Sequence, residues 1–452
     1  MNSLTGFGLP YWLDFDRPQF PRLDSNLTSD IVIIGAGISG LKLAHCLAKH
    51  GISSVILEAN RVGKGASGRN QGTICTAGNS LYHEAIEQFR PACGTDARRY
   101  ARDLWQMGLD NLRLAEAQME ELGICCDYQR EGFHLLVRRD MHGWDSLLQK
   151  YRKDYESLSE DGFAVTWMDE AEAVRRGGNP LYAAGLSYLA DAQFHSGRYV
   201  VGLAQGVCRD KRVQMFEQSR VTQIERRAES AKVVTPNGAV TAKHVFLLTN
   251  ALVPQHVPSL ADGMRAERGQ VLATEPLTQR PCVGSFGTSL AWWRAIPEPD
   301  GRFRFLFGGG RRREEPDSLF RQFDSKGKPH PKLEREGSNP SEAHQRRLEE
   351  QLRTLFPLLA PVRVTHRWGG LQCFTADGLP MIGTFEPRRS IHGMAGFSGR
   401  GNTYTNVGAE FLAGKIAGVA SPVEKRYARL IEKLLAVGRE SARWQPWETT
   451  NE

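Results

Sequence analysis

Three glycines and one glutamate near the N-terminus have the types and the spacing of a dinucleotide site. Gly35, Gly37 and Gly40 stand in GAGISG, which fits the pattern GxGxxG, and Glu58 follows 18 residues after Gly40 (58 − 40). The first glycine permits a tight turn, the second lets the backbone approach a pyrophosphate, and the third lets a helix pack closely on its strand. An acidic side chain at this distance can accept hydrogen bonds from ribose hydroxyls. The spacing therefore predicts a bound dinucleotide.

The surrounding segments predict the elements that must position these residues. Residues 31–34 and 54–57 are short apolar runs typical of buried strands, and residues 41–50 follow a helical pattern. The N-terminus of such a helix offers free N–H groups and a positive dipole end to a phosphate. A second GxGxxG match, at residues 63–68, has no strand leading directly into it. We interpret that second match as chance.

Three further glycine-rich stretches can approach the same ligand. GASGRNQG at residues 65–72 combines small residues with two donors, and GFSGRG at residues 396–401 precedes a helix expected from about residue 407. WGG at residues 368–370 precedes TADGLPMIG at residues 375–383. The first stretch would wrap the pyrophosphate, and a glycine turn at a helix N-terminus can hold a second polar group of the same cofactor. Ordinary glycine-rich loops are the alternative interpretation.

Composition and charge exclude several classes of protein. The net charge is +7, and the densest basic run, Arg311–Arg313, is followed at once by Glu314 and Glu315, which favours a solvated face over nucleic-acid binding. The N-terminus lacks the pattern of a signal peptide, and no apolar run approaches the ~20 residues that cross a bilayer. The eight cysteines and twelve histidines form no metal-ligand spacing. We expect a cytoplasmic protein with reduced thiols, no bound metal and no nucleic-acid partner.

The order of the elements predicts a discontinuous arrangement. Residues 1–28 resemble an extended arm, and residues 421–452 a C-terminal helix and tail. We expect the dinucleotide-binding domain to comprise residues 29–80, 185–262 and 362–420, and a second domain to comprise residues 81–184 and 263–361. Within the second domain, residues 127–138 are expected to form a hairpin and Asp169 to cap a helix.

Six stretches in order carry a resemblance to a known family. They are the Tyr11-Trp12 arm, GAGISG with Glu58, GASGRN, the strands from Trp292 to Arg294 and from Arg304 to Gly309, WGG with TADGLPMIG, and GFSGRG. Together they cover nearly the whole chain. The sequence resembles the D-amino-acid-oxidase-type FAD-dependent oxidoreductases, and the γ-glutamylputrescine oxidoreductase branch is the most similar.

The resemblance implies a fold, a cofactor and a reaction. The fold is α/β: a Rossmann-like FAD-binding domain interleaved with a smaller α+β substrate domain that has a mainly antiparallel sheet. The family oxidises a C–N bond of an amine or amino acid by hydride transfer to flavin N5, and the imine product hydrolyses to an aldehyde or keto acid. No dedicated general base is required, because desolvation lowers the proton affinity of the amine. The implied partners are a small-molecule amine and O2 or another electron acceptor.

The motifs and the resemblance together identify candidate site residues. The cofactor-binding candidates are Gly35, Gly37, Ile38, Ser39, Gly40, Glu58, Ala59, Arg61, Gly65, Ala66, Ser67, Arg69, Asn70, Gln71, Val221, Thr249, Asn250, Gly370, Gly399, Arg400, Gly401, Asn402 and Thr403. The substrate-pocket candidates are Arg400 and Trp292. Because Trp292 and Trp293 are adjacent on a predicted strand, their side chains should point to opposite faces. Core packing is the alternative for both.

Two positions depart from the family pattern. Sarcosine oxidases of this group attach flavin to a cysteine at the position of Gly370, whereas Cys373 stands three residues later. We therefore expect non-covalent FAD. The most similar branch usually has histidine at the position of Arg400, whose guanidinium could bind a substrate carboxylate through two hydrogen bonds. A surface arginine at a glycine turn is the equal alternative.

Several other functions remain as alternatives. A γ-glutamylputrescine-like substrate is favoured, but an oxidase or dehydrogenase of D-amino acids, glycine or sarcosine, or a flavin tailoring oxidase of a specialised pathway, fits the same motifs. A disulfide reductase is not among them, because it would need a second dinucleotide unit and usually a redox cysteine pair, and the sequence has neither. A non-enzymatic flavin-binding scaffold is also compatible with the fold. The sequence does not indicate the oligomeric state.

Overall fold

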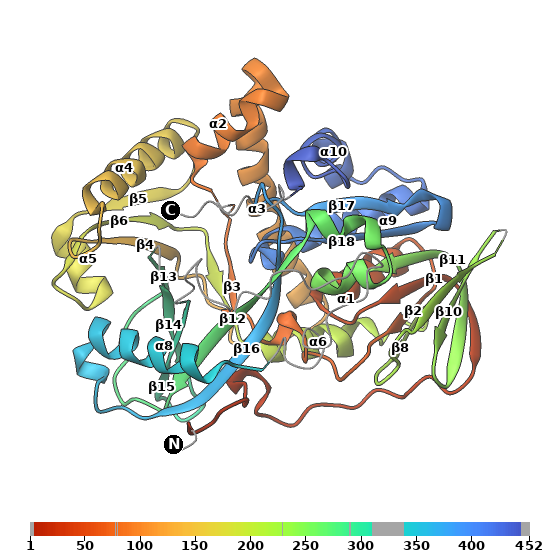
Figure 1. The fold of residues 1–452 in the computed structure, drawn as a ribbon, viewed down its shortest axis with the longest axis horizontal. Coiled ribbons are helices and arrows are strands. Elements are labelled where there is room, and N and C mark those ends of the chain that lie inside the picture. The colour runs from red at the N-terminus through yellow and green to blue at the C-terminus, as the bar shows by residue number, and fades with distance from the viewer. Residues whose placement is uncertain are drawn as a thin grey trace, which may run out of the picture.

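The computed structural model of the 452-residue chain describes residues 4–76, 78, 80–227, 229–288, 291–309 and 339–443. Figure 1 shows two lobes side by side, each built around its own sheet. The basic run Arg311–Arg313 lies outside the described residues.

The first sheet, on the right in Figure 1, contains the predicted dinucleotide-binding unit. Its central strand β1 (Asn26–Ile34) runs parallel to β2 (Ser54–Leu57) on one side and to β11 (Gly238–Leu247) on the other. The order is β17 (Met381–Glu386), β18 (Ile391–Ala395), β11, β1, β2 and β8 (Val213–Phe216). The antiparallel strands β10 (Ala231–Thr235) and β9 (Gln223–Arg226) extend from β11. Residues 31–34 are buried, as expected for a parallel strand that is covered on both faces.

Helices from distant parts of the chain pack beside this sheet. α1 (Ile38–Lys49) contacts both α6 (Ser196–Val207) and α9 (Gly401–Ala417), and every α1 residue except Lys49 is buried. α3 (Ala97–Glu121) also packs on α9, where the Nδ2 of Asn111 donates to the carbonyl of Asn402 over 2.7 Å. Residues 97–121 therefore cover the first domain, although the sequence assigned them to the second. The amphipathic pattern of a helix shows that one face is buried but does not indicate which apolar surface that face will cover.

The second sheet is mainly antiparallel, as expected. Its order is β16 (Val364–Phe374), β12 (Arg265–Thr274), β15 (Phe303–Gly309), β14 (Ala291–Pro297), β13 (Ser285–Gly287), β4 (Phe133–Arg138), β6 (Tyr182–Tyr188) and β5 (Val165–Met168). Only the β13–β4 pair is parallel among the pairings of this sheet that the described residues make. α8 (Glu342–Leu355) packs on β12 and β15, and the fully buried Trp293 stacks on Phe286 in the core below it.

Two strands correct the predicted domain boundaries. β16 pairs with β12 along nearly its whole length, so residues 364–374 belong to the second sheet rather than to the first domain. β6 likewise extends the second sheet to Tyr188, past the predicted boundary at residue 185. The chain re-enters the first sheet at β17. Within β16, Gly370 pairs with Gly269 across the two strands.

The hairpin predicted for residues 127–138 is wrong. Only β4 forms there, and it pairs with the distant strands β13 and β6. Gln129 instead forms an isolated bridge with Gln193 in β7 (Ala192–Gln193), which pairs with β3 (Thr73–Ile74) between the two lobes. The capping prediction is confirmed, because the Asp169 carboxylate accepts from Glu172 N at the start of α5 (Glu170–Gly177).

The N-terminal arm crosses both domains. The Gly8 N–H donates to the carbonyl of Arg367 at the edge of the second sheet. Trp12 is fully buried, and its Nε1 donates to the carbonyl of Asn70 over 2.7 Å. Farther along, Leu23 N donates to the Ser219 Oγ beside the first sheet. The arm therefore ties the two domains together.

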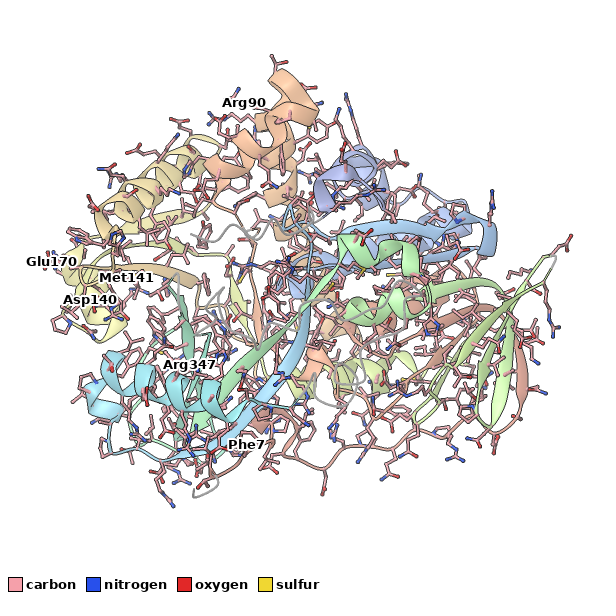
Figure 2. The ribbon with its side chains drawn as sticks, viewed as in Figure 1. Phe7, Arg90, Asp140, Met141, Glu170 and Arg347 are labelled. Carbon is pink, nitrogen blue, oxygen red and sulfur yellow. The ribbon has the colours of Figure 1, made fainter. Side chains whose placement is uncertain are left out.

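The remaining helices lie at the periphery. α2 (Tyr82–Cys93) and α4 (Trp144–Glu160) pack against each other, and α10 (Pro422–Leu434) packs on α9. Figure 2 shows Asp140, Met141 and Glu170 at the outer edge of the second lobe, where Glu170 pairs with Arg139. No helix within the described ranges has the length and apolar character needed to span a membrane.

Candidate active site

The first glycine turn has the geometry that the sequence predicts. Gly35 has a φ of +107°, and a Cβ added there would lie 3.0 Å from the carbonyl oxygen of Leu248. A Cβ added to Gly40 would lie 2.0 Å from the carbonyl oxygen of Gly35, so α1 can pack on the turn only without a side chain. α1 begins at Ile38 with no side-chain cap from Gly37. Its first turn is thus available to an anionic ligand.

Glu58 follows β2 directly and is held by backbone donors. Its Oε2 accepts from Ala36 N over 3.0 Å, and its Oε1 accepts from Asn60 N over 2.9 Å. Loss of hydration raises the pKa of Glu58, although the bonds from Asn60 and Ala36 act in the opposite direction. Each oxygen keeps a lone pair for a further donor. The side chain is therefore a fixed acceptor for hydroxyl groups.

A cavity of about 360 Å³ connects most of the predicted cofactor residues. The predicted residues that line it are Gly35, Gly37, Ile38, Ser39, Glu58, Ala59, Gly65, Ala66, Ser67, Asn70, Val221, Thr249, Asn250, Gly399, Gly401 and Asn402. Three separate parts of the chain thus border one space. Sequence reasoning missed other lining residues, among them Gln372, Cys373 and Phe397. Their proximity to WGG and GFSGRG was the available signal.

Seven predicted cofactor residues lie outside the lining of this cavity. They are Gly40, Arg61, Arg69, Gln71, Gly370, Arg400 and Thr403. Arg61 donates to the carbonyls of Arg17 and Pro18 in the arm, and Arg69 donates to those of Lys64 and Gly369. The Oγ1 of Thr403 donates to the Cys75 carbonyl. These three side chains hold backbone segments beside the cavity.

The GASGRN loop is fixed by two indoles and by Asn70. Trp12 donates to the Asn70 carbonyl over 2.7 Å, and Trp368 on β16 donates to the Arg69 carbonyl over 3.0 Å. The Asn70 Oδ1 accepts from Gly72 N and from the Ser196 Oγ. The loop is therefore held in place from the arm, from the second sheet and from α6.

The GFSGRG turn brings a second helix N-terminus to the cavity. Ser398 and Gly399 have positive φ values of +50° and +85°, and α9 begins at Gly401 without a side-chain cap. Asn250, itself at φ +49°, accepts from Gly396 N through its Oδ1 and fixes the turn. Free N–H groups of α9 thus lie at the same cavity as those of α1.

The TADGLPMIG motif has a structural role in this chain. The buried Asp377 carboxylate pairs with Arg439 through two hydrogen bonds of 2.7 and 2.8 Å and accepts a third from Ser441. Burial raises the pKa of Asp377, but its bonds to Arg439 and Ser441 outweigh this and hold it below its usual value. Asp377 lines neither described cavity. It anchors the segment that follows α10.

A second cavity has a volume of about 280 Å³. Its lining residues are Cys75, Gly78, Ser80, Leu81, Glu84, Phe133, Leu135, Leu147, Lys150, Tyr151, Tyr188 and Arg400. Arg400 borders this second cavity, whereas its neighbours Gly399 and Gly401 border the first. The walls combine apolar and aromatic side chains with polar and charged ones, and Glu84 and Lys150 form an ion pair of 2.9 Å in the lining.

Arg400 carries a positive charge into this second cavity. Burial lowers the pKa of Arg400, but the Cys75 thiol and the Asp191 carboxylate raise it, and the net result lies above the ordinary value. The guanidinium also lies over the ring of Phe133, 6.0 Å from the centroid. A charged guanidinium that borders a cavity can bind a carboxylate through strong, charge-assisted hydrogen bonds.

The second substrate-pocket candidate, Trp292, lines neither cavity. Its indole lies over Gly308, where a Cβ would come within 2.2 Å of the ring. Trp292 packs against one apolar cluster and Trp293 belongs to another, in agreement with the predicted alternation. Both tryptophans are packing residues.

In the described part of the chain, no three His, Cys, Asp or Glu side chains lie close enough together to bind a metal ion. The polar groups that do gather are the amides of the glycine turns, one fixed carboxylate and one guanidinium. Such groups suit an organic phosphate-bearing cofactor rather than an ion.

Comparisons with known proteins agree with this site. The family model described as FAD dependent oxidoreductase, DAO, matches residues 30–414. The chain is 26% identical over 413 residues to "Probable oxidoreductase OrdL" of Haemophilus influenzae, covering 88% of this chain and 85% of the relative. It is 27% identical over 414 residues to the gamma-glutamylputrescine oxidoreductase of Escherichia coli, covering 89% and 86%. The crystal structure of glycine oxidase from Geobacillus kaustophilus superposes with a TM-score of 0.68 at 17% identity, covering 88% of this chain and 96% of that one.

Proposed function

The chain belongs to the DAO family of FAD-dependent oxidoreductases, and from this premise we propose that its substrate is an amine that also carries a carboxylate. The enzyme uses FAD and acts on CH–NH or CH–NH2 donors. Among such amines we favour a γ-glutamylated diamine, because one relative is named for γ-glutamylputrescine. The residues present fit FAD, since a Cβ at Gly35 or Gly40 would clash with the turn and Glu58 offers fixed acceptors at the same cavity.

The proposal is carried by the position of Arg400. Its side chain borders the second cavity, while the adjacent residues Gly399 and Gly401 border the cofactor cavity. A carboxylate bound there would hold its molecule close to the turn whose glycines border the cofactor cavity. Positioning of this kind can supply a large part of a rate enhancement.

The walls of the second cavity would prepare the amine for oxidation. Phe133, Leu135, Leu147 and Tyr151 give part of the space an apolar surface, while Glu84 and Lys150 pair with each other elsewhere in the lining. Such surroundings disfavour an ammonium ion, so a bound amine loses its proton more readily than in water. FAD supplies the hydride acceptor at flavin N5. The chain's own contribution is to orient the substrate, to exclude water and to lower the pKa of the amine.

We further propose that FAD is bound without a covalent link. Gly370 stands where related sarcosine oxidases carry the attachment cysteine. Cys373 borders the cofactor cavity, but burial raises its pKa to about 12. A thiol with this pKa is almost entirely protonated at neutral pH and is a poor nucleophile.

An α-amino acid is the second candidate substrate. The proximity of Arg400 to the cofactor cavity favours it, because the carboxylate of an α-amino acid is bonded to the carbon that is oxidised. Oxygen or another acceptor would reoxidise the flavin. We also propose a cytoplasmic location, which is supported by eight cysteines that are all unpaired.

The test compares amines that carry a carboxylate with related amines that lack it. We would measure kcat/KM for γ-glutamylputrescine against putrescine, and for alanine enantiomers against ethylamine, in the wild type and in Arg400→Gln. The wild type should prefer the carboxylate-bearing member of one pair, and the variant should lose that preference through a higher KM. Arg98→Gln, which removes an exposed arginine, is the matched control. An unchanged preference in Arg400→Gln would refute the role of Arg400.

A further inference from the structure

Asp191 is a buried acid next to the second cavity with an incomplete set of hydrogen bonds. It is fully buried and lies just before β7. Its Oδ1 accepts from Thr76 N over 2.9 Å and from Thr76 Oγ1 over 2.6 Å. Its Oδ2 accepts from no N–H or O–H group among the described residues, and the Cys75 thiol beside Asp191 acts as a weak donor that lowers its pKa. Burial raises the pKa of Asp191 to about 6, despite these bonds and the charge of Arg400.

The surroundings of Asp191 connect it to Arg400. The Cys75 thiol interacts with the side chains of both Asp191 and Arg400. Tyr188 and Tyr404 also face this cluster, and the Tyr188 hydroxyl donates to the Asp154 carboxylate over 3.1 Å. Cys75 and Arg400 border the second cavity, as does Tyr188.

Apart from Asp191, the groups in this cluster whose pKa values are shifted each keep one protonation state near neutral pH. Burial raises the pKa values of Cys75 and Tyr404 to about 12 and that of Tyr188 well above its ordinary value. The pKa of Arg400 is raised. Asp191 is the member of this cluster whose pKa lies close to neutral.

A purely structural role does not account for a charge at this position. Holding Thr76 needs one acceptor oxygen, which an asparagine would provide without burying an anion. An ionised carboxylate in an apolar interior is costly unless a cation compensates it. Arg400 is a cation whose charge favours the ionised form of Asp191 and lowers its pKa.

We propose that Asp191 is the counter-ion of Arg400 and a proton-linked positioning residue, which takes up a proton when a substrate carboxylate binds to Arg400. This inference rests on the proposed function, because it requires Arg400 to bind that carboxylate. In the empty cavity the Asp191 anion balances the guanidinium. A bound substrate places a second anion on the same cation, and repulsion between the anions favours protonation of Asp191. The proton comes from solvent, so the charge of the cluster is conserved.

The experiment uses the FAD-loaded protein and acetate, a carboxylate without an amine to oxidise. Acetate binding is followed through the flavin absorbance between pH 5 and pH 8. The protons taken up are counted by calorimetry in two buffers with different ionisation enthalpies. In the wild type we expect the Kd to rise up to about tenfold per pH unit above pH 6, with up to one proton bound per site. In Asp191→Asn we expect a Kd that is independent of pH in this range and no proton uptake.

Two further variants separate the possible explanations. Thr76→Val removes the hydroxyl donor to Asp191 but keeps the carboxylate, so it should keep the pH dependence even if its melting temperature falls. Arg400→Gln should bind acetate at least tenfold more weakly at every pH. If Arg400→Gln binds acetate as well as the wild type does, the proposed function fails, and this inference with it.

The result that overturns this inference alone is Arg400-dependent acetate binding with no proton uptake in the wild type. An unchanged pH dependence in Asp191→Asn would overturn it equally. If Asp191→Asn does not fold or load FAD, the proton count in the wild type decides the question by itself.

Discussion

Replacement of Glu58 by glutamine tests how the first cavity holds FAD. Both carboxylate oxygens are engaged, one by Ala36 N and the other by Asn60 N. An amide keeps one oxygen and turns the other into an NH2 group, which cannot accept from a backbone N–H. Glu58→Gln therefore loses one backbone bond and also presents a donor to the cavity in place of an acceptor.

The size of the effect follows from the bonds that are lost. A hydrogen bond to a charged group contributes about 1.5–3 kcal/mol, which corresponds to an increase of about 10- to 150-fold in the Kd for FAD when one ribose contact is lost. The pH dependence has a definite sign. Ribose donors favour the ionised carboxylate, so FAD affinity in the wild type should fall as the pH falls through the pKa of Glu58. Because that pKa is raised by burial, the fall should begin above the usual range for glutamate.

The assay is equilibrium dialysis of apoprotein with FAD between pH 4.5 and pH 8, with circular dichroism as the check on folding. Glu225→Gln, a change on β9 that lies outside the cavity lining, is the matched control and should leave the Kd unaltered. A Glu58→Gln variant that is folded and binds FAD within twofold of the wild type would refute the assignment of Glu58 as a ribose acceptor.

Two further substitutions and one experiment on the wild type have defined outcomes. Asp377→Ala should lower the free energy of unfolding by about 3–5 kcal/mol in urea titrations, because it leaves the buried Arg439 without its carboxylate partner. In the wild type the pKa of Asp377 is lowered, so the pair should lose its contribution to the free energy of unfolding as the pH falls through that pKa. Trp12→Phe removes the hydrogen bond to the Asn70 carbonyl and should lower the free energy of unfolding by about 0.5–1.5 kcal/mol in the same titrations. FAD should also dissociate faster on dilution, and an unaltered dissociation rate would contradict the role of the arm in supporting the GASGRN loop. On a denaturing gel the flavin fluorescence should separate from the protein, whereas fluorescence that stays with the band would contradict non-covalent FAD.

The sequence was most informative where one residue type satisfies a local requirement. Gly35 and Gly40 predicted their turn correctly, since no other residue fits the contacts they make. Asp169 predicted a helix start for the same reason, because capping depends on neighbouring residues alone. The parallel centre of the first sheet and the mainly antiparallel second sheet also agreed with expectation.

Features that depend on distant partners could not be predicted. The apolar residues of β4 indicated a strand but not that its partners are β13 and β6. Residues 364–374 were assigned to the first domain because the pairing of β16 with β12 is invisible in the local sequence. The burial of Asp191 and its proximity to Cys75 and Arg400 likewise arise only after three separate segments come together.

The central claim is that this chain oxidises an amine carrying a carboxylate with bound FAD. The most direct measurement is to mix the purified yellow protein, without oxygen, with D- and L-amino acids, glycine, sarcosine, putrescine and γ-glutamylputrescine while recording the flavin absorbance. The claim predicts bleaching by γ-glutamylputrescine or by one class of amino acid, with a far slower response to putrescine, and recovery when an electron acceptor is admitted. Rapid bleaching by putrescine alone, or a protein that takes up no FAD, would contradict it.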